Sequence, residues 1–182
     1  MLDPLYLETR QLRLNPIDAA ELLRYRDLIT EVFELFSDAE TLHFIPEKKL
    51  NHLAEAEQWL KAAILSAHSG RNVIHLITDK SSGRLAGIVD IIPPAVAREH
   101  YRLGYYPFFI EFYLKAEYKG KTLMSKLLPK ILQALEAQGI PKVAAVVNRR
   151  NYAASKLLAK CGFHYREPFD VLQDFYEFTQ VA

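Results

Sequence analysis

The feature that most constrains the fold is a strand-like run, a loop and a helix-like run that follow one another between Phe108 and Gln138. Phe108 to Leu114 is apolar and aromatic apart from one glutamate, as in a buried strand. The helix-like run from Leu123 carries apolar residues at every fourth position. The loop between them, Tyr118 to Thr122, holds one glycine and two lysines. A helix N-terminus behind such a loop offers free backbone N–H groups and partial positive charge, so the segment predicts a phosphate-binding turn.

The rest of the chain alternates between strand and helix patterns. Periodicity and turn residues predict further strands at 5–14, 72–78, 85–92, 142–147, 163–167 and 171–178, and helices at 18–36, 50–68, 123–138 and 151–160. The segments 42–49 and 93–107 are expected to be irregular, and 80–83 is expected to be a hairpin turn. This order predicts a mixed α/β fold built on one sheet, in a single domain that spans residues 1–182.

Composition limits the partners and the compartment. The 182 residues include 23 basic and 22 acidic side chains, so the basic excess typical of proteins that bind nucleic acid or anionic membranes is missing. One cysteine fits a reducing compartment, and neither a secretory signal nor a bilayer-spanning run is apparent, so a cytoplasmic location is expected. The six histidines show no metal-ligand spacing, so no metal is expected.

Two local sequences extend the pattern to a family resemblance. Glu8 to Leu14 is similar to the first strand, and Asn151 to Phe163 to the asparagine-containing helix, of the ribosomal-protein branch of the GNAT superfamily of N-acetyltransferases. Together with the element order, the resemblance covers nearly the whole chain. It implies the GNAT fold, a single mixed and mostly antiparallel twisted sheet flanked by helices. It also implies acetyl-CoA as co-substrate, without a metal, and a small-molecule or peptide amine as acceptor.

The loop departs from the family's pyrophosphate-binding pattern. That pattern reads Gln or Arg, two residues, Gly, one residue, then Gly or Ala, and this chain has Lys119, Thr122 and Met124 there. The positive charge is kept, but the glycine is lost. A left-handed Thr122 would be strained by about 1–2 kcal/mol, and we expect that strain to weaken binding about tenfold, whereas a right-handed Thr122 would avoid it.

The resemblance nevertheless implies a set of coenzyme-binding residues: Leu114, Lys119, Gly120, Lys121, Thr122, Leu123, Met124, Ser125, Asn148 and Asn151. The alternative for the loop is a plain strand-to-helix turn whose lysines face water. The alternative for Asn151 is a helix cap, a role that alone explains an asparagine at this position.

Glu111 is the predicted general base. It interrupts the apolar run from Phe108 to Leu114, and burial among apolar groups would raise its pKa into the range useful for catalysis. Relatives often carry a glutamate two residues earlier, where this chain has Phe109, and residues two apart on a strand share a face. The alternatives are a carboxylate paired with an arginine or one that faces solvent.

No familiar proton donor is in place. The tyrosine that many relatives carry seven residues after the helix asparagine is Leu158 here, and the serine of the ribosomal-protein branch is Ala154. Tyr113 is the candidate substitute. Tyr101, Tyr105, Tyr106 and Phe108 either line the acceptor pocket or belong to the core.

Three functions remain open at this point. The first is transfer of an acetyl group from acetyl-CoA to a primary amine of a small molecule or a protein N-terminus. The second is a weak or inactive GNAT-fold module that senses acyl-CoA or binds protein, because Thr122, Met124, Ala154 and Leu158 all depart from the family. The third is transfer of a different acyl group. The acceptor and the choice between monomer and homodimer stay open.

Overall fold

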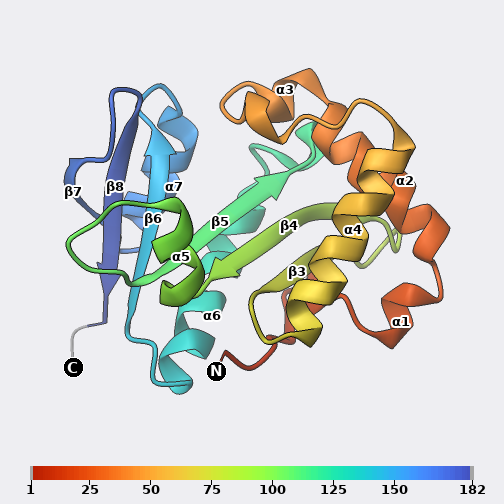
Figure 1. Ribbon diagram of the computed structural model, residues 1–182, viewed down its shortest axis with the longest axis horizontal. Helices are drawn as coiled ribbons and strands as arrows, with labels where there is room; N and C mark the ends of the chain where they lie inside the picture. The colour runs from red at the N-terminus through yellow and green to blue at the C-terminus, as the bar shows by residue number, and fades with distance from the viewer. Residues whose placement is uncertain (1, 181–182) are drawn as a thin grey trace. The chain divides into compact units, whose positions relative to one another are not determined.

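A computed structural model describes residues 2–180 of the chain. Eight strands form one sheet in the order β1-β2-β3-β4-β5-β6-β8-β7 (Figure 1). The strands are β1 (Leu7–Glu8), β2 (Leu12–Pro16), β3 (Val73–Asp79), β4 (Leu85–Ile92), β5 (Phe108–Leu114), β6 (Lys142–Asn148), β7 (His164–Pro168) and β8 (Gln173–Thr179). β5 and β6 run parallel, whereas the pairs β1–β2, β2–β3, β6–β8 and β7–β8 are antiparallel. The predicted mixed sheet is confirmed.

The helices alternate with the strands much as the sequence predicts. They are α1 (Ala19–Leu22), α2 (Tyr25–Ser37), α3 (Ala39–Leu42), α4 (Leu53–His68), α5 (Pro94–His100), α6 (Leu123–Ala137) and α7 (Tyr152–Lys160), with 3-10 turns η1 (Pro46–Lys48) and η2 (Ala116–Tyr118). The predicted apolar stripe of α6 is buried at Leu123, Leu127, Ile131 and Leu135. Within residues 2–180, no helix is both long enough and apolar enough to cross a membrane.

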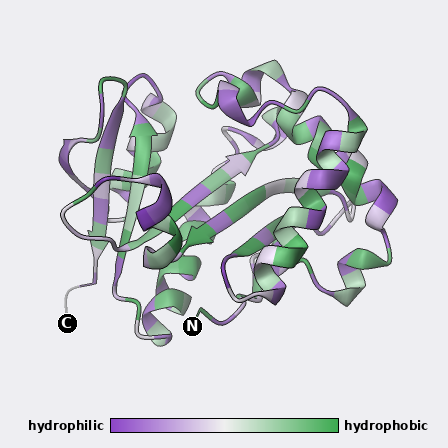
Figure 2. Ribbon diagram, in the orientation of Figure 1, coloured by the Kyte–Doolittle hydropathy of each residue, from purple (hydrophilic) through white to green (hydrophobic). Residues whose placement is uncertain are grey.

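The chain divides into two compact units. The first contains Asp3–Asp90 and Phe112–Leu123. Its core joins α2 and α4 to β3 and β4 through Leu28, Val32, Leu35, Phe36, Ala56, Leu60, Leu76, Leu85 and Ile88. β4 is coloured hydrophobic along most of its length in Figure 2, and nearly every residue of it is buried.

The second unit contains Leu2, Ile91–Glu111 and residues 124–180. Its core gathers residues of β4, α5, β5, β6 and β8: Ile92, Val96, Ala97, Phe109, Ala144 and Phe175. β6 pairs with β8 along its whole length, from Lys142 opposite Thr179 to Asn148 opposite Gln173. Its ladder with β5 consists of Phe108 opposite Val143 and Phe109 opposite Ala144.

Three predicted elements are wrong in their extent. The first strand is instead a hairpin of β1 and β2, and Asn15 and Pro16 belong to β2 rather than ending it. Asp18 caps a helix as predicted, but that helix ends at Leu22 and α2 begins anew at Tyr25. The segment predicted to be irregular contains α5, whose Pro94 stands at the helix start, where the lack of an N–H costs no hydrogen bond.

Candidate functional site

The C-terminal end of β5 is fixed by contacts within the first unit. The Thr41 hydroxyl donates to the Leu114 carbonyl at 3.2 Å, and the Lys115 amide donates to the Ala86 carbonyl at 3.0 Å. A side chain at Gly87 would place its Cβ 2.2 Å from the Tyr113 carbonyl oxygen, so only glycine allows this approach of β4 to β5. The end of β5 is therefore held in place, and the loop that follows begins at a fixed position.

The loop itself turns through two left-handed residues. Lys119 is extended, with φ −68° and ψ 154°, Gly120 has φ 71°, and Thr122 has φ 56° directly before α6 begins. Among residues 2–180, Thr122 is the only residue other than glycine with a positive φ. A β-branched side chain is a strong outlier in this region. The backbone thus keeps a glycine-like conformation at the position where the family pattern has glycine.

Both loop lysines have partners in the first unit. The Lys119 ammonium lies 3.7 Å from a carboxylate oxygen of Glu40, in α3. The Lys121 ammonium lies 5.7 Å from the centre of the Tyr118 ring, and the Tyr118 hydroxyl donates to Asp79 at 3.3 Å. The alternative in which the loop lysines only face water therefore leaves out these contacts.

A small cavity lies beside the loop. Its volume is about 300 Å³, and it is lined by Arg10, Gln11, Leu12, Asp79, Lys80, Ser81, Tyr118, Lys121 and Leu123. Two predicted coenzyme-binding residues, Lys121 and Leu123, are among them. Among the cationic side chains that line this cavity, Lys80 forms an ion pair with Glu8 at 2.7 Å.

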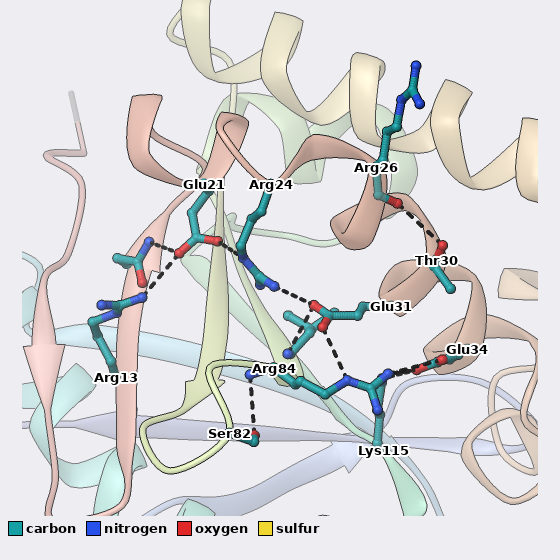
Figure 3. A network of polar contacts seen from close by, with 12 residues as sticks. Arg13, Glu21, Arg24, Arg26, Thr30, Glu31, Glu34, Ser82, Arg84 and Lys115 are labelled. Carbon is teal, nitrogen blue, oxygen red and sulfur yellow. Dashed lines mark hydrogen bonds and ion pairs between the residues drawn. The ribbon is translucent and has the colours of Figure 1, made fainter.

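A chain of ion pairs connects β2, α1, α2 and the end of β5 (Figure 3). Glu21 bonds Arg24 at 2.8 Å, Arg24 bonds Glu31 at 2.9 Å, and Leu85 donates its amide to Glu31 at 3.1 Å. Glu21 and Glu31 are only 2% and 4% exposed, so removal of a partner would leave a buried charge uncompensated.

The chain of ion pairs ends directly before the loop. Glu34 in α2 accepts from Arg84 at 2.9 Å and from the buried Lys115 at 2.5 Å. Neighbouring Lys115 and Arg84 lower the pKa of Glu34 against the effect of its partial burial, so it is charged at neutral pH.

A second pocket, of about 460 Å³, is lined by members of this network, Arg24, Glu31 and Arg84, with Asp27, Thr30, Ser82 and Gly83. Its charges largely neutralise one another.

Glu111 has a tyrosine as its partner. The Tyr101 hydroxyl donates to the Glu111 carboxylate at 3.2 Å. Tyr101 is held in turn, because its ring packs 4.9 Å from that of Phe109 and its carbonyl accepts from Tyr106 at 2.9 Å. Glu111 is half-buried and comes two residues after the last β5 residue of the ladder with β6. The contact with Tyr101 was not predicted, because nothing in the sequence pairs a residue after α5 with one in β5.

Tyr113 lies on the same side of β5 as Glu111 by strand alternation. Its ring packs 5.5 Å from that of Phe36, and the Lys48 ammonium lies 5.1 Å from its centre. Tyr113 therefore contributes to the packing of α2 and η1 on β5, and its role as a proton donor stays a prediction.

The two predicted asparagines form the turn between β6 and α7. The Asn151 side chain accepts from the Ala154 amide at 3.1 Å, which confirms its role as a helix cap. The Asn148 side chain accepts from the Arg150 amide at 3.0 Å, and its carbonyl accepts from the Asn151 amide at 2.8 Å. Contact of either residue with a coenzyme stays a prediction, as it does for buried Met124 and half-buried Ser125.

Sequence reasoning missed a buried carboxylate in β8. Glu177 is 2% exposed, bonds Arg166 at 2.9 Å and accepts a hydrogen bond from Tyr105. Burial and the bond to this carboxylate raise the pKa of Tyr105 to about 12, so Tyr105 keeps its proton at neutral pH. The break in the aromatic run Phe175-Tyr176-Glu177-Phe178 is the signal that could have revealed Glu177.

Two further kinds of reactive group, the cysteine thiol and potential metal ligands, bear on the chemistry of the described residues. Cys161 is half-buried, and burial raises the pKa of its thiol, which argues against a thiolate nucleophile. Within the part of the chain that the structure describes, no three of the His, Cys, Asp and Glu side chains gather as metal ligands would.

Comparisons with known proteins identify the family and the fold. The family described as Acetyltransferase (GNAT) domain matches residues 16–164. The fold is similar to ribosomal-protein-S5-alanine acetyltransferase from Vibrio fischeri, with a TM-score of 0.71 and 15% identity over 96% of both chains. It is also similar to the microcin C7 self-immunity acetyltransferase MccE, solved with acetyl-CoA and AMP (TM-score 0.70, 14% identity, 94% of both chains).

A third similar structure is RimL, a ribosomal L7/L12 alpha-N-protein acetyltransferase, with a TM-score of 0.68 and 15% identity over 98% of this chain and 95% of that one. The names of two of the three describe them as ribosomal-protein acetyltransferases. No curated protein matches the chain in sequence. At these identities the structural likeness establishes the fold, and the family match over most of the chain shows that it belongs to the GNAT acetyltransferase family.

Proposed function

We propose that this protein transfers an acetyl group from acetyl-CoA to a primary amine of a small molecule or a protein N-terminus. The observation that carries the proposal is the left-handed Thr122, which keeps the glycine-like turn of a pyrophosphate loop in a GNAT domain. Strain held by a residue that disfavours it is typical of functional turns. MccE, which shares the fold, was solved with acetyl-CoA bound.

In this proposal the loop binds the diphosphate of the coenzyme. Lys119 and Lys121 supply charge, and the backbone N–H groups at the start of α6 supply hydrogen bonds and the helix dipole. Leu114 and residues 119–125 form this part of the site, and Asn148 and Asn151 contact the coenzyme arm.

The transfer is direct. The amine nitrogen attacks the thioester carbonyl carbon and forms the new C–N bond, the C–S bond breaks, and the coenzyme leaves as its thiolate. Glu111 accepts the proton that the amine loses, and Tyr101 orients the Glu111 carboxylate through its hydroxyl. Tyr113 returns a proton to the thiolate.

Glu111→Gln tests the catalytic part of this proposal. We expect kcat/KM to fall by about 10²- to 10⁴-fold, the usual contribution of a general base, with unchanged affinity for acetyl-CoA. Tyr101→Phe, which keeps the ring packing but removes the donor, should cause a smaller loss. The measurement is release of coenzyme A thiol with a panel of amines and peptides, across pH. Unchanged turnover and an unchanged pH profile in Glu111→Gln would remove Glu111 from the mechanism.

The same assay separates the proposal from its rivals. Binding of acetyl-CoA without turnover on any amine would favour a sensor of acyl-CoA. Turnover with another acyl-CoA but not with acetyl-CoA would favour a different donor.

A further inference from the structure

We propose that Glu40 competes with the phosphates of the coenzyme for Lys119 and thereby sets how tightly the loop binds coenzyme A. This inference rests on the proposed function. In the structure, the Lys119 ammonium lies 3.7 Å from a Glu40 carboxylate oxygen. The Glu40 side chain is 66% exposed and that of Lys119 is 35% exposed, so the pair can separate at low cost.

Glu40 is not on a loose segment. The Asp38 carboxylate caps α3 by accepting from the Thr41 amide at 2.7 Å, while the Thr41 hydroxyl donates to the Leu114 carbonyl at 3.2 Å. Thr41 itself is only 8% exposed. Because Leu114 is the last residue of β5, α3 is tied to the strand end from which the loop emerges, and Glu40 is held near Lys119.

The charge of Lys119 also acts on a second carboxylate, that of Asp38, which caps α3. Hydrogen bonds from Thr41, and to a smaller degree the positive charge of Lys119, lower the pKa of Asp38, so Asp38 is ionised at neutral pH. Lys119 therefore pairs with Glu40 and also interacts electrostatically with the ionised Asp38 at the start of α3.

An anion bound at the loop would change this arrangement. A diphosphate would bring negative charge to Lys119, repel Glu40 and take its place on the ammonium. Binding then includes the loss of the Glu40–Lys119 contact, which is a cost that the family pattern of the loop does not reveal. The contact also makes α3 a segment whose polar partners differ between the free and the coenzyme-bound protein.

The size of the effect follows from the exposure of the pair. Exposed ion pairs are worth roughly 0.2–1 kcal/mol, which corresponds to a change in affinity of up to about fivefold. We therefore expect Glu40→Gln to bind coenzyme A about two- to fivefold more tightly than the unaltered protein.

Calorimetric titration with coenzyme A tests the inference in five proteins: the unaltered chain, Glu40→Gln, Glu57→Gln, Lys119→Gln and the double variant of Glu40 and Lys119. Glu57→Gln is the matched control, because it removes the same charge from an exposed pair, with Lys61 at 2.7 Å on the same helix. It should leave the affinity unchanged. In the Lys119→Gln background, Glu40→Gln should lose most of its gain.

Three results would overturn the inference: no gain in Glu40→Gln, an equal gain in Glu57→Gln, or a gain that persists without Lys119. Failure of the proposed function looks different. It appears as no binding in any of the five proteins, or as Lys119→Gln binding as tightly as the unaltered chain.

Discussion

In the folded chain, Thr122 is held in a conformation that its branched side chain disfavours. The strain of about 1–2 kcal/mol therefore lowers the free energy of unfolding. The left-handed case of the sequence-based expectation therefore applies, and the roughly tenfold weaker binding expected for it stays a prediction.

Thr122→Gly should accordingly raise the free energy of unfolding by roughly 1 kcal/mol, because relief of the strain exceeds the extra entropy of glycine in the unfolded chain. Gly120→Ala is the matched opposite change. Gly120 has φ 71° and open space around its missing Cβ, so alanine there adds backbone strain without a steric clash. Because this strain exceeds the entropy that alanine removes from the unfolded chain, Gly120→Ala should destabilise by a similar amount. Urea unfolding of both variants measures the difference. A destabilised Thr122→Gly protein would show that the turn is not strained.

His75 in β3 links the N-terminal segment to the sheet. It is fully buried, and its Nε2 accepts from the Leu5 amide at 2.9 Å. Burial lowers its pKa from 6.5 to about 4. Between these values the unfolded chain binds a proton that the folded chain does not, so stability is greatest above pH 6.5 and falls as the pH drops toward 4.

The expected loss across this window is about 3 kcal/mol, at 1.36 kcal/mol for each unit of pKa difference. Urea unfolding at a series of pH values measures it. In His75→Gln, whose side-chain oxygen can still accept from Leu5, this part of the pH dependence should disappear. His164→Gln, at an exposed position of β7, should keep it. Parallel pH profiles for the unaltered chain and His75→Gln would contradict the account.

Elements defined by local signals were predictable. Asp18 and Asn151 cap the helices that follow them, Gly83 has a positive φ in the predicted hairpin turn, and Gly139 and Gly162 have a positive φ just after predicted helices. These features depend on neighbours within a few residues, which the sequence displays directly. The helix α5 was missed because a proline such as Pro94 indicates the end of a helix unless it is known to stand at the first helical position.

At the scale of the whole molecule, the order of elements was enough to predict the fold class, and the family followed only with the local resemblances at 8–14 and 151–163. The polar partners of the candidate site were not predictable. Glu111 with Tyr101, Lys119 with Glu40, and Glu177 with Tyr105 join side chains that lie on different elements. Periodicity fixes the face of a strand on which a residue lies, but not the residue that meets it from another element.

The central claim is that the end of the loop and the first residues of α6, together 119–125, bind acetyl-CoA. Thermal unfolding with millimolar acetyl-CoA tests this claim most directly. A ligand at 100 times its Kd stabilises by about 2.7 kcal/mol, which for a chain of this size raises Tm by about 5–10 °C. We expect a shift of this order in the unaltered protein and a much smaller one when Lys119 and Lys121 are both replaced by glutamine. No shift in the unaltered protein, or an equal shift in both proteins, would contradict the claim.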